Sequence, residues 1–335
     1  MVEKEGADVA LPDFLLIGAP KAGTTALHVA LAGHPQLFLS AVKEPKFFLT
    51  DGTPPVARGG PGDARTIREQ VWRRADYEAL FDPTPPGALR GESTTLYLRD
   101  PAAHRRIAAL LPAARLVAVV RDPVDRAHSN WTHLRSAGLE PEADFLRACG
   151  LERQRAELGW APFWRYLELG RYGEQLRHLY SVFPPEQVHV VLYRDLRQHP
   201  AGTLDGICAF LGVDTGLVRE LPAENVTAEA PHSPLHQLVG GALRALAHRL
   251  PDPLERRLTR SGRRLLQREQ RTRTPLTVAE RERLIPGFEA DITLLESLTG
   301  LRLDHWRDPA NGTARRPLEI RGRFGTAHTS IDRPG

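Results

Sequence analysis

The sequence predicts an α/β fold in which a parallel β-sheet is flanked by helices on both faces. Three short apolar runs carry this prediction, at 14–17, 115–120 and 187–193. Runs that are apolar at nearly every position are typical of strands covered on both faces. Helical patterns separate these runs along the chain, which is the order that a parallel sheet with crossover helices requires.

The composition is that of an ordinary soluble protein. The chain has 335 residues, enough for one large α/β domain, with 41% hydrophobic and 26% charged residues. Its start is acidic and lacks the apolar core of a signal peptide, and no apolar run approaches the length of a membrane span. The cysteines Cys149 and Cys208 form no ligand or disulfide pattern, so we expect a cytoplasmic protein without membrane insertion. A net charge of +4 is too small to require a nucleic-acid partner.

Lysine is rare in this chain and unevenly placed. Only four of the 45 basic residues are lysines, and three of these are Lys21, Lys43 and Lys46. An ammonium group is a compact donor that arginine does not replace at a tight contact. The clustering favours a binding site around this segment, with chance clustering as the alternative.

The first predicted strand leads into a loop bracketed by Gly18 and Gly23, and a helix is predicted from Thr25 to Gly33. Such a loop directs backbone N–H groups and a helix N-terminus at one point, which suits a phosphate or a similar anion. It nearly matches the pattern G-x-x-x-x-G-K-[ST], but Thr24 stands in the lysine position and Lys21 lies inside the loop. The magnesium-dependent phosphoryl-transfer design is incomplete, because no apolar strand ends in an aspartate that could hold the metal. The alternative is an ordinary turn with a surface lysine.

A second strand is predicted at 36–39, and the segment Lys43-Glu44-Pro45-Lys46-Phe47-Phe48 follows it. Pro45 predicts an extended rather than helical Glu44, and the two phenylalanines anchor the segment. A carboxylate between two lysines close to the anion loop indicates a site; the alternative is a surface ion cluster. The Gly- and Pro-rich residues 51–65 predict a mobile loop, and residues 66–81 predict one amphipathic helix.

Residues 89–97 predict a short strand that runs into a polar turn, and Asp100-Pro101 marks a helix start. The apolar run 115–120 ends at Arg121, where open α/β sheets bind ligands, and Asp122-Pro123 begins the next helix. Ser129 lies roughly 9 Å further along that helix. The guanidinium and the hydroxyl together suit a second phosphate; the alternative is an ion pair between Arg121 and a neighbouring aspartate, Asp122 or Asp125.

Residues 141–183 are predicted to be mostly helical, with an aromatic core cluster of Trp160, Phe163, Trp164 and Tyr166. The strand at 187–193 is followed by predicted helices at 200–211, 233–249, 252–268 and 277–298, the last kinked at Pro286. The basic turn 271–275 either closes over a phosphate or is a solvated linker. We expect a flexible start at 1–12, one domain over 13–306 and a disordered tail at 307–335.

These motifs resemble those of the PAPS-dependent sulfotransferases, most of all the bacterial branch and the heparan-type carbohydrate branch. Pro20-Lys21-Ala22-Gly23-Thr24-Thr25 is similar to the family's 5′-phosphosulfate loop, and Arg121 with Ser129 to its 3′-phosphate motif. The segment from Lys43 to Phe48 is similar to the one whose glutamate serves as catalytic base. Two anion sites also suit a nucleoside that carries phosphate groups at both ends. The resemblance spans residues 12–306.

The resemblance implies a P-loop-like sulfotransferase fold with added C-terminal helices. It implies transfer of a sulfuryl group from PAPS (3′-phosphoadenosine 5′-phosphosulfate) to a hydroxyl, or less readily an amine, of a small molecule or carbohydrate, without a metal. Glu44 would take the acceptor proton and Lys21 would stabilise the leaving phosphate. The implied donor-binding residues are those of the two motifs and one more arginine: Lys21, Ala22, Gly23, Thr24, Thr25, Arg121, Ser129 and Arg273.

One position departs from the heparan branch, which carries a lysine where this chain has Ser93. Either Lys43 or Lys46 takes over its role, or the protein does without it. The acceptor pocket is predicted at the 51–65 loop and the aromatic helices of 141–166. Two other functions stay open: a small-molecule kinase with an altered phosphate loop, and a non-catalytic nucleotide- or nucleic-acid-binding protein that uses its arginine-rich helices.

Overall fold

The computed structural model describes residues 10–56, 59–222 and 275–311. Within them five parallel strands form one sheet in the order β2-β3-β1-β4-β5. The strands are β1 (Phe14–Gly18), β2 (Leu37–Leu39), β3 (Leu89–Ser93), β4 (Arg115–Val120) and β5 (Val188–Leu192). The predicted parallel sheet is confirmed, and the three apolar runs are its strands β1, β4 and β5.

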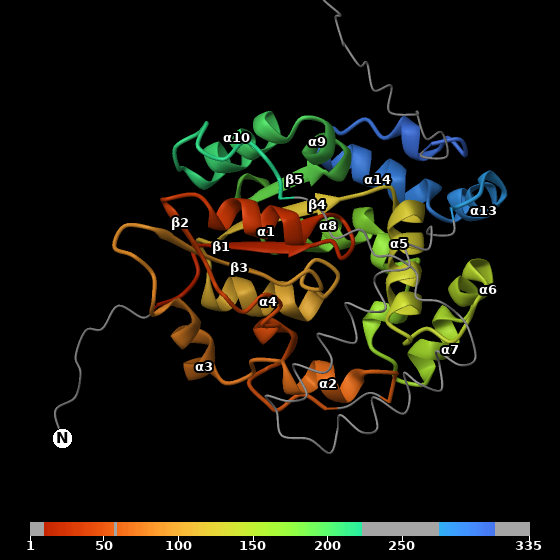
Figure 1. Ribbon diagram of the computed structural model, residues 1–335, viewed down its shortest axis with the longest axis horizontal. Helices are drawn as coiled ribbons and strands as arrows, with labels where there is room; N and C mark the ends of the chain where they lie inside the picture. The colour runs from red at the N-terminus through yellow and green to blue at the C-terminus, as the bar shows by residue number, and fades with distance from the viewer. Residues whose placement is uncertain (1–9, 57–58, 223–274, 312–335) are drawn as a thin grey trace, which may run out of the picture.

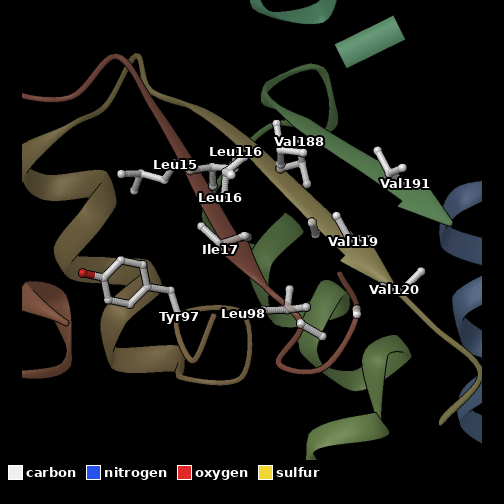
Figure 2. Close-up of a cluster of buried hydrophobic side chains, with 14 of the residues drawn as sticks. Leu15, Leu16, Ile17, Tyr97, Leu98, Leu116, Val119, Val120, Val188 and Val191 are labelled. Carbon is white, nitrogen blue, oxygen red and sulfur yellow. The ribbon is translucent and has the colours of Figure 1, made fainter. Parts of the chain in front are cut away.

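The centre of the sheet is apolar on both faces. Every residue of β1 is buried, and β4 is exposed only at Arg115, its first residue. Figure 2 shows side chains of these two strands and of β5 gathered in one apolar cluster. Strands of this kind are stable only where helices cover both faces.

Helices cover both faces because the chain leaves β1 and β3 in opposite directions. It passes from β1 through α1 (Thr24–Ala32) to the edge strand β2, and from β3 through α4 (Pro101–Leu110) back past β1 to β4. Right-handed crossovers in opposite directions place these two helices on opposite faces, as Figure 1 shows. α8 (Tyr172–Tyr180) packs beside α4, and α10 (Pro200–Leu211) packs on β5.

Two helices begin where the sequence predicts. The side chain of Asp100 accepts hydrogen bonds from two N–H groups in the first turn of α4, and Asp122 does the same for α5 (Pro123–Ser136). A proline follows each aspartate as the first helical residue. A cap of this kind typically stabilises a helix by about 1 kcal/mol. The cap at Asp122 fixes the corner between β4 and α5, where Arg121 lies.

The predicted single helix at 66–81 is wrong. The chain forms α2 (Asp63–Arg68) and α3 (Arg74–Glu78), and a 3₁₀ turn (Ala79–Phe81) follows. Between α2 and α3 the N–H of Val71 donates to the carbonyl of Pro45 at 2.9 Å, and Gln70 Nε2 donates to the carbonyl of Lys46 at 3.0 Å. The Val71 N–H, which a continuous helix would use, thus bonds to a distant segment, and the Gln70 side chain adds a second bond to it.

The chain after β4 is mostly helical, as the sequence predicts for residues 141–183. The remaining helices are α6 (Phe145–Gly150), α7 (Glu152–Glu157), α9 (Tyr193–Gln198), α13 (Val278–Leu284) and α14 (Glu289–Thr299). A 3₁₀ turn (Ile285–Gly287) interrupts the last predicted helix at Pro286, which confirms the kink. Trp164 and Tyr166 are buried in a second apolar cluster beside Trp131, as predicted for core aromatics.

Some expectations lie outside the described residues. These are the helices at 233–249 and 252–268, the turn that contains Arg273, and most of both chain ends. The domain limits therefore stay a prediction. Among the residues that the structure describes, none of the helices has both the length and the apolar character that a membrane crossing needs.

Candidate active site

Three segments that the sequence singled out meet at one edge of the sheet. The loop with Lys21 follows β1, Arg121 follows β4, and the turn Ser93-Thr94-Thr95 ends and follows β3. These strands are neighbours in the order β3-β1-β4. The chain leaves β1 towards β2 but leaves its neighbours β3 and β4 in the opposite direction, and open α/β sheets bind ligands at such a switch point.

The loop after β1 is shaped as an anion cradle. Lys21 and Gly23 both have a left-handed backbone, with φ of 67° and 85°. Gly23 occupies the N-cap position of α1, and no side chain caps that helix start. The N–H groups of the first turn are therefore left to a ligand, since an anion at a helix N-terminus satisfies them. A Cβ on Gly23 would lie 2.9 Å from the ring of Tyr193, so a larger residue does not fit there.

Arg121 lies against this loop. Its Nη1 donates to the carbonyl of Lys21 at 3.1 Å, and its guanidinium carbon lies 4.7 Å from the ring centre of Tyr193. The alternative ion pair of Arg121 with Asp122 or Asp125 is wrong, because both carboxylates bond to Arg281, at 3.0 and 2.7 Å. The two predicted anion sites are thus direct neighbours, although they are 100 residues apart in the chain.

A pocket of about 280 Å³ opens beside Arg121, between the ends of β4 and β5. Its lining includes two further arginines, Arg194 and Arg197, and the aromatic residues Tyr193 and Trp306. Arginines recognise phosphate through paired charge-assisted hydrogen bonds. The sequence analysis did not select Arg194 or Arg197. The signal was their place just after β5, which corresponds to the place of Arg121 after β4.

Two predicted donor contacts, Ser129 and Arg273, stay untested. Ser129 is half-buried within α5 and does not line the pocket. The structure describes both Ser129 and Arg121 and gives no hydrogen bond between them. Arg273 lies outside the described residues, so the contacts of Ser129 and Arg273 with a phosphate stay predictions.

Glu44 is held against the turn after β3. Its carboxylate accepts hydrogen bonds from the N–H and the hydroxyl of Thr95, at 3.1 and 3.0 Å, and from Lys43 Nζ at 3.0 Å. Its own N–H donates to the carbonyl of Ser93 at 2.8 Å. The predicted extended backbone is wrong: φ of Glu44 is 62°, a left-handed conformation that these bonds stabilise. Glu44 is therefore fixed rather than a loose surface charge.

Backbone strain is concentrated at this site. Among the residues that the structure describes, the non-glycine residues with positive φ are Lys21, Glu44 and Lys46. Such a conformation costs on the order of 1–3 kcal/mol and is found mostly where function requires it. The same three positions lie in the two segments predicted to form the site.

The aromatic anchor of this segment is confirmed. The ring of Phe47 stacks on Tyr77 at 4.2 Å between centroids, and Phe48 is buried, with its N–H donating to the hydroxyl of Tyr97. Burial lowers the pKa of the Lys46 ammonium, and the nearby carboxylates Glu44 and Glu69 oppose the shift. The anchor thus holds Lys46 and Glu44 beside the end of β3.

Sequence reasoning missed two groups beside Glu44. Glu92, which is 0% exposed, accepts hydrogen bonds from the hydroxyls of Tyr77 and Thr94, and burial raises its pKa to about 7. The second is His28 on α1: its Nδ1 lies 2.7 Å from Oγ of Ser93. Burial lowers the pKa of His28 to about 4. No local pattern in the sequence indicated the contact of His28, because Ser93 lies 65 residues away.

Residues 12–216 match the sulfotransferase family. The chain belongs to this family. It is 30% identical over 214 residues to human bifunctional heparan sulfate N-deacetylase/N-sulfotransferase 2, a match that covers 61% of this chain and 22% of that protein. It is also 30% identical over 203 residues to human heparan sulfate glucosamine 3-O-sulfotransferase 3B1, covering 61% of this chain and 46% of that one. The chain thus spans less than half the length of these two curated relatives.

A solved structure agrees with this assignment. The sulfotransferase from Alicyclobacillus acidocaldarius is 27% identical, with a TM-score of 0.69, and the match covers 89% of this chain and all of that one. The predicted family and the predicted P-loop-like sulfotransferase fold are confirmed.

Proposed function

We propose that this protein transfers a sulfuryl group from PAPS to a hydroxyl group of a small molecule or carbohydrate. The observation that supports this best is the order of groups along the sheet edge. The carboxylate of Glu44 lies at the end of β3, the Lys21 loop follows β1, and Arg121 follows β4. A donor bound along this edge would lie next to a base, an anion cradle and an arginine, in that order.

PAPS has the charges that such an edge needs. Its 5′-phosphosulfate is proposed to lie on the N–H groups of the loop, with Lys21, Thr24 and Thr25. Its 3′-phosphate is assigned to Arg121, with Ser129 and Arg273 as further contacts. The pocket between β4 and β5 is assigned to the nucleoside, and its arginines add positive charge beside the 3′-phosphate.

The chemistry is an in-line displacement at sulfur. Glu44 takes the proton of the acceptor hydroxyl as its oxygen attacks, and a new oxygen–sulfur bond forms. The bond between sulfur and the 5′-phosphate oxygen breaks, and that oxygen keeps the electron pair, so adenosine 3′,5′-bisphosphate (PAP) leaves. Lys21 and the loop N–H groups stabilise the charge that develops there. No step in this scheme needs a metal.

The relatives favour a carbohydrate acceptor. The names of two of them specify sulfation of heparan sulfate at a nitrogen and at a 3-oxygen. We propose that the acceptor group is a hydroxyl, with an amine as the second candidate. Gly60 of the 51–65 loop lies against Trp160, since a Cβ on it would be 3.3 Å from the indole. The loop therefore contacts the aromatic segment at Trp160, and we propose that this contact forms a side of the acceptor site.

The test uses sulfur-35 PAPS, because sulfuryl and phosphoryl groups have nearly the same mass. Cell extract is incubated with the protein, labelled PAPS and EDTA, and products are separated and identified by mass spectrometry. We expect a labelled product with the added mass of SO₃, absent with Lys21→Ala. Transfer of phosphate from ATP, dependent on magnesium, would instead support the kinase, and salt-sensitive DNA binding without transfer would support the non-catalytic protein.

A further inference from the structure

A histidine from another element reaches the end of β3. His28 lies on α1, one turn after the anion loop, and its Nδ1 is 2.7 Å from Oγ of Ser93. Ser93 is 0% exposed. The resemblance to the heparan branch places a lysine at this position, where the present chain instead carries a hydroxyl that meets an imidazole.

Ser93 in turn holds the backbone of Glu44. The carbonyl of Ser93 accepts the N–H of Glu44 at 2.8 Å, at a residue whose φ is 62°. Two residues later Thr95 holds the Glu44 carboxylate through its N–H and hydroxyl. One short turn therefore fixes both the strained backbone and the carboxylate of Glu44, and His28 contacts that turn from the side of α1.

The charges around His28 favour the neutral imidazole. The pKa of His28 is lowered to about 4, mainly by burial and also by the Lys43 ammonium, while the Glu44 carboxylate opposes both. A neutral ring at neutral pH can share a hydrogen bond with Ser93 without adding a positive charge beside Lys43. A lysine at the position of Ser93 would add that charge next to the base.

We propose that His28 is a positioning residue that fixes Ser93, and through it the backbone of Glu44, for proton transfer from the acceptor. This inference rests on the proposed sulfuryl transfer. His28 acts through Ser93, so its loss should lower kcat while donor binding stays intact.

The test compares His28→Leu, His28→Asn, Ser93→Ala and the double variant that combines His28→Leu with Ser93→Ala. Turnover of sulfur-35 PAPS is measured at saturating donor in the same extract, and PAP binding is measured by thermal shift. We expect His28→Leu and Ser93→Ala each to lower kcat about tenfold, as small displacements of a reacting group do. Because both act on one contact, the double variant should be no slower than either single variant.

His28→Asn supplies the rescue, since its amide can replace Nδ1 in the bond to Ser93; we expect kcat within about threefold of the native value. Val29→Ala, a half-exposed neighbour on the same helix, is the matched control and should leave kcat unchanged. Three results would each overturn the inference. They are native turnover in His28→Leu, losses of kcat that multiply in the double variant, and a smaller thermal shift with PAP in place of a lower kcat. A native protein that neither binds PAP nor consumes PAPS would overturn the sulfuryl-transfer proposal itself.

Discussion

Lys21, Glu44 and Lys46 hold side chains where glycine would be the unstrained choice. Each has a left-handed backbone, and each lies at the edge where the ends of β1 and β3 meet. Retaining an ammonium or a carboxylate there, against a cost on the order of 1–3 kcal/mol per residue, is expected only if the side chain is used. At the residue scale this is the strongest structural support for the roles proposed for Lys21 and Glu44.

Glu44→Gln tests the proposed base. The amide oxygen of glutamine can accept the N–H of Thr95 and its NH2 group can donate to the Thr95 hydroxyl, so we expect the segment to keep its shape, but an amide cannot take a proton. We expect kcat to fall by about 10²–10⁴-fold while PAP binding stays close to native. Steady-state kinetics with sulfur-35 PAPS and a binding assay with PAP give the two values. Loss of PAP affinity with little change in kcat would show that Glu44 is structural.

The turn after β3 is the element that organises the base. Glu92 accepts from the hydroxyl of Thr94, which in turn accepts from the N–H of Lys46 at 3.2 Å. Its other oxygen accepts from Tyr77, whose ring stacks on Phe47. A fully buried carboxylate therefore connects β3 to both sides of the segment that carries Glu44.

Glu92→Gln tests this buried carboxyl through its pH dependence. Burial raises the pKa of Glu92 from 4.5 to about 7, so the folded protein keeps a proton that the unfolded chain releases in this window. The stability that this proton contributes is present below about pH 4.5 and is lost as pH rises through 7. Glutamine resembles the protonated form at every pH. We expect the free energy of unfolding of Glu92→Gln, relative to native, to rise by up to about 3 kcal/mol between pH 4.5 and pH 8.

Urea denaturation at the two pH values measures this difference. Thr203→Ala, a change at a half-buried residue of α10 whose hydroxyl donates to the carbonyl of His199, is the control and should show no such pH dependence. An unfolding difference for Glu92→Gln that is equal at both pH values would show that folding does not raise the pKa of Glu92.

The elements differ in how far the sequence determines them. β1, β4 and the helix starts at Asp100 and Asp122 follow from local apolar runs and Asp-Pro pairs, and these predictions are confirmed. The break in the 66–81 helix depends on a bond to Pro45, a residue outside that helix. A helical pattern contains no information about such a bond.

The candidate site, like the fold, is only partly determined by local sequence. The loop around Lys21 and the strand end at Arg121 could be located because each is a contiguous motif at the end of an apolar run. The left-handed backbone of Glu44 depends on Ser93 and Thr95, which lie about 50 residues later in the chain. The contact of His28 with Ser93 spans 65 residues, and nothing near His28 in the sequence indicates it.

At the scale of the whole molecule, α13 and α14 stabilise the region around the corner that carries Arg121. Arg281 of α13 is 0% exposed and bonds to Asp122 and Asp125, and Asn311 bonds to Asp122 at 3.0 Å. The carboxylate of Asp291 on α14 accepts the N–H groups of Gly173 and Glu174 at the start of α8. Helices near the end of the chain therefore hold the corner after β4 and the start of α8 in place, and Figure 1 shows them on that side of the sheet.

The central claim is that the loop after β1 and the arginine after β4 bind two phosphates of one nucleotide. Thermal unfolding with PAP tests it most directly, with adenosine 5′-monophosphate as the ligand that lacks the 3′-phosphate. At a concentration near 100 times the dissociation constant, PAP should stabilise the native protein by about 2.7 kcal/mol, and the monophosphate should stabilise it much less. Lys21→Ala and Arg121→Ala should each reduce the PAP shift, and Glu44→Gln should keep it. No shift with PAP, or an equal shift with both nucleotides, would contradict the claim.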